Sequence, residues 1–115
     1  MKKVALFVFN GDPVCFIHVL LNGLDMHEKG MDGRIIVEGA ATALLPELAK
    51  SENPLHKLWE KAKAQGIVEG VCKGCAHKMG TAAEAVIQGL AVLEDMSGHP
   101  SMSRYIETGF EVISF

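Results

Sequence analysis

Two cysteines and a histidine lie within six residues of one another in the segment Cys72-Lys73-Gly74-Cys75-Ala76-His77. A cysteine thiolate attacks sulfur, carries a persulfide sulfur, or binds a metal such as zinc. The Cys-x-x-Cys spacing places Cys75 within one turn of Cys72, where it can resolve a disulfide or share a metal. The alternative is that both are small buried apolar side chains, which is a common state of cysteine.

The position of Cys72 predicts an ionised thiol. The apolar run from Ile67 to Cys72 predicts a strand that ends at this cysteine, and the residues after it predict the start of a helix. Unpaired N–H groups at a helix start stabilise negative charge, and Lys73 and His77 add positive charge nearby. We therefore expect the pKa of Cys72 to fall from about 8.5 into the range of about 3.5–7.5.

A second pair, Cys15 and His18, has Cys-x-x-His spacing on one face of the first predicted helix. Together with Cys72, Cys75 and His77 it is able to form a tetrahedral zinc or iron site. By base rate, a buried thiol beside a hydrogen-bonded histidine is the commoner outcome for such a pair. His99 precedes Pro100 in a loop that is able to approach the cysteine edge, where ligands gather at the ends of parallel strands, which makes it a candidate supporting residue.

The elements that position the candidate site residues are predicted strands that alternate with predicted helices along the chain. Asp12 and Pro13 predict an N-cap and first helical turn, and Thr81 and Glu84 predict a capping box. Residues 90–94 are ambiguous between strand and helix, and Gly89 favours a strand. Strands are expected over 4–9, 34–37, 67–72 and 110–115, with helices over 12–30, 40–50 (broken near Pro46), 53–66 and 101–108.

This alternation predicts an α/β fold with a parallel sheet between helical layers. The length of 115 residues and the lack of linkers or repeats predict a single domain over 1–115.

The net charge of −3 and the absence of a clustered basic stripe argue against nucleic-acid binding. No stretch approaches the ~20 apolar residues that span a bilayer. The three cysteines are too few for a secreted disulfide framework, so we expect a cytoplasmic protein.

The chain resembles the DsrE/DsrF-like family of small sulfur-relay proteins, which includes the TusD-type subunits. The resemblance lies in the apolar first strand with its polar turn, in Gly70-Val71-Cys72 with Gly80 eight positions on, and in the closing Gly109-Phe110-Glu111-Val112-Ile113. It implies a three-layer α/β/α sandwich with a five-stranded, mainly parallel sheet. It also implies a homo-oligomer, a trimer or hexamer, in which Cys72 carries a persulfide. Cys75 and the Cys15/His18 pair depart from the general family pattern.

The first functional hypothesis is therefore sulfur transfer. Cys72 would accept a sulfane sulfur from a donor protein and pass it to the thiol of an acceptor protein. Lys73 would stabilise the thiolate, Cys75 would resolve the persulfide, and no cofactor would be needed.

Two alternatives remain open. The first is a zinc- or iron-binding module that uses Cys72 and Cys75 with either His77 or the Cys15/His18 pair. The second is a non-catalytic assembly subunit that buries apolar faces between protomers. Those faces would include Leu44, Leu45, Leu48 and the region of Met102.

Overall fold

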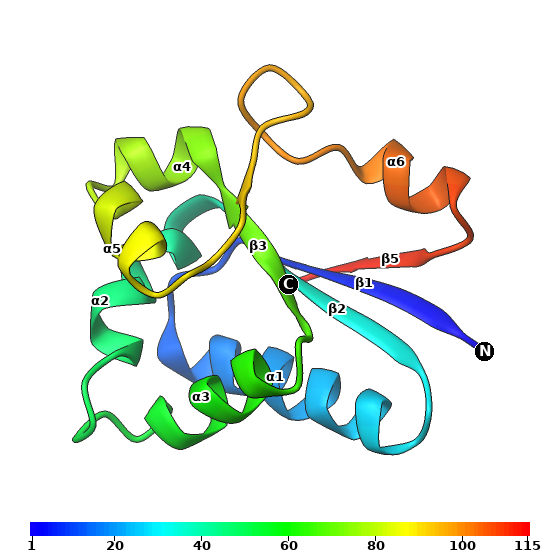
Figure 1. Cartoon of the computed structure of the whole chain (residues 1–115), viewed down its shortest axis with the longest axis horizontal. Coiled ribbons are helices and arrows are strands. Elements are labelled where there is room, and N and C mark those ends of the chain that lie inside the picture. The colour runs from blue at the N-terminus through cyan, green and yellow to red at the C-terminus, as the bar shows by residue number, and fades with distance from the viewer.

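The computed structural model describes all 115 residues and contains one sheet of five parallel strands (Figure 1). The strands pair in the order β4-β3-β2-β1-β5, and every pairing is parallel. The predicted α/β fold with a parallel five-stranded sheet is confirmed. The strands are β1 (Lys3–Val8), β2 (Asp32–Val37), β3 (Val68–Cys72), β4 (Val92–Leu93) and β5 (Glu111–Ser114).

The helices connect the strands, and α1 begins where its capping residues predict. The side chain of Asp12 accepts a hydrogen bond from the Val14 N–H at 2.9 Å, and Pro13 occupies the first turn of α1. Gly30, at φ +81°, follows the end of α1. The helical segments are α1 (Pro13–Glu28), the 3-10 helix η1 (Gly39–Leu44), α2 (Leu45–Leu48), α3 (His56–Ala64), α4 (Lys73–Lys78), α5 (Ala82–Ile87) and α6 (Met102–Glu107).

The two faces of the sheet carry layers of different size. Alternate residues of β1 point to opposite faces: Leu6 and Val8 join the large core with α1 to α5 and η1, whereas Phe7 packs with Tyr105 of α6 and Phe110. Figure 1 shows α6 on the side of the sheet away from α1 and α3. Because both faces are covered, β1 is a continuous apolar run, as a central parallel strand should be.

Three local predictions are refined by the structure. The apolar residues after Gly89 form a strand only at Val92–Leu93. The segment 40–50 divides into η1 and α2, with Pro46 in the first turn of α2, because proline lacks the N–H that a continuous helix would need. The predicted capping box is wrong: the Thr81 hydroxyl donates to the Thr42 carbonyl at 2.9 Å and does not cap α5.

The prediction of an apolar assembly face is also wrong for two of its residues. Leu45 and Leu48 are buried in the core of the chain itself, so they are not available to a partner. Among the helices, none combines the length and the apolar character that crossing a bilayer would require.

Candidate functional site

Four side chains of types that can bind a metal meet at the carboxyl edge of the sheet. Glu38 directly follows β2, Cys72 ends β3, Cys75 lies in the first turn of α4, and His99 lies in the loop after β4. One ligand atom from each lies within 4.8 Å of all the others. These residues are called the Cys2HisGlu cluster below. The carboxyl ends of neighbouring parallel strands bring together groups that are far apart in the sequence.

Two distances within the Cys2HisGlu cluster can be compared with those of a metal site. The Cys72 Sγ lies 2.9 Å from the His99 Nδ1, and the Cys75 Sγ lies 3.7 Å from the same nitrogen. Zinc–sulfur bonds of about 2.3 Å and zinc–nitrogen bonds of about 2.0–2.1 Å separate tetrahedral ligand atoms by roughly 3.5–3.8 Å. A bound ion therefore requires only a small opening between Cys72 and His99.

The loop that carries His99 is held against α4 by backbone contacts. The Gly74 N–H donates to the Gly98 carbonyl at 2.8 Å. A Cβ atom at position 74 would lie 2.9 Å from the His99 Cε1, so only glycine allows this close approach. Met96 and His99 exchange backbone hydrogen bonds of 2.7 and 2.9 Å, which fix the turn of the loop. The glycine of the Cys-x-x-Cys segment is thus what lets the histidine reach the thiols.

Burial determines the charge state of Cys72. The side chain is fully buried, and this burial raises the pKa of the thiol to about 12. The Cys75 N–H donates to the Cys72 Sγ at 3.4 Å and lowers the pKa, but the neighbouring Cys75 thiol and Glu38 carboxylate raise it again. The predicted lowering of the Cys72 pKa is therefore wrong, because one helix-start N–H does not offset desolvation and two acidic neighbours.

Glu38 is the residue of the cluster that sequence reasoning missed. Its side chain is only 6% exposed, and burial raises the pKa of its carboxyl group, opposed by hydrogen bonding to Cys72 and by the charge of His99. An acid directly after a predicted parallel strand was the available signal, since such positions face the site edge. His99, which the sequence offered as a candidate supporting residue, does reach the cysteine edge.

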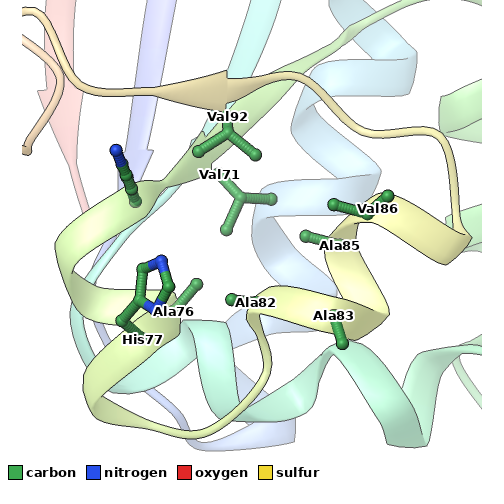
Figure 2. A pocket seen from close by; sticks show the side chains of 9 residues that line it. Val71, Ala76, His77, Ala82, Ala83, Ala85, Val86 and Val92 are labelled. Atoms are coloured by element: carbon green, nitrogen blue, oxygen red, sulfur yellow. The ribbon is translucent and has the colours of Figure 1, made fainter.

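The other predicted site residues do not join the cluster. The Lys73 ammonium group pairs with Glu94 at 3.3 Å. His77 lines a separate apolar cavity of about 330 Å³. Figure 2 shows its side chain on the same cavity as Val71, Val92 and the labelled residues of α5.

Cys15 and His18 also lie outside the cluster. Both are in the first two turns of α1, where Cys15 is half-buried and His18 is exposed. The Cys2HisGlu cluster therefore draws its residues from the position after β2, the end of β3, α4 and the loop after β4, with none from α1.

The comparisons with known proteins establish relatives and a fold. No family model matches the chain. A shorter match joins 37% of it to 70% of an uncharacterized protein of Archaeoglobus fulgidus, at 40% identity. The solved structure of BT1422, a conserved protein of unknown function from Bacteroides thetaiotaomicron, superposes with a TM-score of 0.66 at 16% identity. That match covers 98% of this chain and 95% of BT1422, and it shows the fold.

A longer sequence match identifies the family. The uncharacterized protein MJ0733 of Methanocaldococcus jannaschii is 33% identical over 119 residues, a match that covers 96% of this chain and 93% of MJ0733. The two proteins therefore share both sequence and length over nearly their whole extent. The chain belongs to the protein family that includes MJ0733.

Proposed function

We propose that the protein binds one transition-metal ion, zinc or iron(II), through Cys72, Cys75, His99 and Glu38. The observation that carries the proposal is the convergence of these four donor groups to within 4.8 Å from separate parts of the chain. Thiolate and imidazole donors suit zinc and iron, whereas magnesium and calcium prefer sites built from oxygen.

The electrostatics of the cluster supports a bound cation. Cys72 and Glu38 are both buried, and burial raises the pKa of each by more than their neighbours lower it, so their charged forms are incompletely compensated within the chain. A divalent cation supplies that compensation and displaces the thiol protons as it binds. Two thiolates, one carboxylate and a neutral imidazole around a divalent ion leave a net charge of −1, which is far smaller than the charge of the ligands alone.

Elemental analysis tests this proposal. The protein is purified without a metal-affinity tag, and we expect about one zinc or iron ion per chain, as four ligands make one site. Cys75→Ser should lose most of the metal. Cys15→Ser is the matched control, because it removes a thiol outside the cluster and should retain the metal. Metal in substoichiometric traces, or equal loss in both variants, contradicts the proposal.

Sulfur transfer is a second candidate, and the 2.9 Å contact between the Cys72 Sγ and the His99 Nδ1 favours it. The imidazole is the group placed to accept the thiol proton when the thiolate forms, a step that the burial-raised pKa of Cys72 opposes. The resulting thiolate would attack the outer sulfur of a donor persulfide, form a persulfide on Cys72 and release the donor thiolate. Cys75 lies close enough to resolve that persulfide. The DsrE/DsrF-like resemblance supports this candidate as well.

Mass spectrometry after incubation with a persulfide donor separates the two candidates. Sulfur transfer predicts an added sulfur on Cys72 in the wild type and none in Cys72→Ser. Metal binding predicts that zinc-loaded protein resists this labelling, because metal-bound thiolates are held by the ion.

The DsrE/DsrF-like resemblance also leads us to propose a homo-trimer or homo-hexamer. Sedimentation velocity measures this oligomeric state directly.

A further inference from the structure

A cavity of about 410 Å³ adjoins the Cys2HisGlu cluster at the carboxyl edge of the sheet. Glu38 and His99 form part of its wall, whereas Cys72 and Cys75 do not line it. A molecule in the cavity therefore meets the carboxylate and imidazole sides of the cluster first. Of the four proposed ligands, Glu38 and His99 are the two that an incoming molecule can displace.

The remaining wall is apolar and rich in sulfur. It consists of Phe9, Met96, Pro100 and Met102, with two hydroxyl groups from Ser101 and Ser103. Sulfur makes favourable contacts with aromatic rings such as that of Phe9, and the polarizable thioethers of methionine adapt to irregular apolar gaps. The wall contains no lysine or arginine, and Glu38 contributes an acid. Carboxylates and phosphates are therefore disfavoured in the cavity, whereas a neutral molecule with a soft donor atom is favoured.

We propose that a small organic thiol binds in this cavity and replaces Glu38 as a ligand of the metal; this rests on the proposed metal binding. The metal–oxygen bond to Glu38 breaks and a metal–sulfur bond to the entering thiol forms. The thiol proton passes to the released carboxylate, since a coordinating thiol is deprotonated. No electrons are transferred. Glu38 leaves because its hard oxygen is the poorest match for an ion that already holds two thiolates.

The test uses the full-length chain loaded with cobalt(II), whose sulfur-to-metal charge-transfer absorption reports the number of bound thiolates. The probe is 2-mercaptoethanol, and ethylene glycol is its oxygen analogue. Three thiolates in place of two should raise the absorption by roughly half and saturate. Ethylene glycol should leave it unchanged. Gel filtration then shows that the cobalt remains on the protein.

Two tryptophan variants locate the thiol site. Ser101→Trp adds bulk to the cavity wall and should weaken thiol binding at least tenfold without loss of cobalt. Val86→Trp is the matched control, because Val86 is 69% exposed and lines the other cavity, beside His77 (Figure 2). The Val86→Trp variant should bind the thiol with the affinity of the wild type.

The possible failures are distinguishable. A wild-type chain that binds no cobalt overturns the proposed function itself. A chain that holds cobalt but shows no absorption change with thiol overturns only the thiol proposal. The thiol proposal is equally overturned if the thiol strips cobalt from the protein, if ethylene glycol acts like the thiol, or if Ser101→Trp binds the thiol with wild-type affinity.

Discussion

The substitution Glu38→Gln should stabilise the metal-free protein and weaken metal binding at the same time. Glu38 is 6% exposed and burial raises the pKa of its carboxyl group, so the ionised form is costly in the folded state. Its side chain does not cap η1, so glutamine forfeits no cap. Removal of a destabilising functional group commonly gives about 0.5–2 kcal/mol. For a domain of this size that gain is a rise of several degrees in melting temperature.

The pH dependence of this stabilisation follows from the direction of the pKa shift. A carboxyl group whose folded-state pKa lies above its unfolded value contributes its full stability below the unfolded pKa, and loses it as the pH rises through the folded pKa. The melting temperatures of Glu38→Gln and wild type should therefore converge near pH 4 and separate toward pH 7, as measured by circular dichroism on metal-free protein.

The same variant has an opposite expected effect on metal affinity. Replacement of a carboxylate ligand by an amide should lower the affinity at least as much as loss of an outer-shell partner, which costs about 10–100-fold. Competition with a chromophoric chelator measures this change. A Glu38→Gln protein that is less stable without metal, and that binds metal as the wild type does, would refute the reasoning, because the carboxylate would then be a structural hydrogen-bond acceptor.

Three further predictions concern single positions. Gly74→Ala places a Cβ 2.9 Å from the His99 Cε1 and should weaken metal binding about 10–100-fold in chelator competition; wild-type affinity would show that the loop adapts freely. Gln88→Ala removes the 2.8 Å acceptor of the buried Trp59 Nε1–H and should cost about 1–3 kcal/mol in urea unfolding; an unchanged midpoint contradicts this. In metal-free protein the pKa of Cys72 is about 12. Its alkylation rate, followed by mass spectrometry, should therefore rise about tenfold per pH unit from pH 7 to 10, and a plateau below pH 9 excludes so high a value.

The layered fold was predictable because periodicity and capping report local structure directly. The continuous apolar run of β1 indicated a strand buried on both faces, and the Asp12 cap with Pro13 located the start of α1. The alternation of such elements then required parallel pairing. The capping box predicted at Thr81 does not form because of a tertiary contact. The Thr81 hydroxyl donates a hydrogen bond to the carbonyl of Thr42, 39 residues away, and not to the adjacent helix.

The candidate site was predictable only in part. Cys72 and Cys75 were identifiable from their spacing at a strand end, and His99 from its place at the same edge of the sheet. Glu38 offered only its position after a predicted strand, and that signal does not distinguish a solvated acid from a buried one. The sign of the Cys72 pKa shift also depends on burial. The cation adjacent to Cys72 in sequence, Lys73, is paired with Glu94, 21 positions away.

X-ray absorption spectroscopy of the zinc- or iron-loaded protein tests the central claim most directly, because it counts the atoms bound to the ion. For zinc, the Cys2HisGlu cluster predicts two sulfur atoms at about 2.3 Å and two nitrogen or oxygen atoms at about 2.0–2.2 Å. One sulfur should disappear in Cys75→Ser. A shell of nitrogen and oxygen alone, or a spectrum that this substitution leaves unchanged, would contradict metal binding by the cluster.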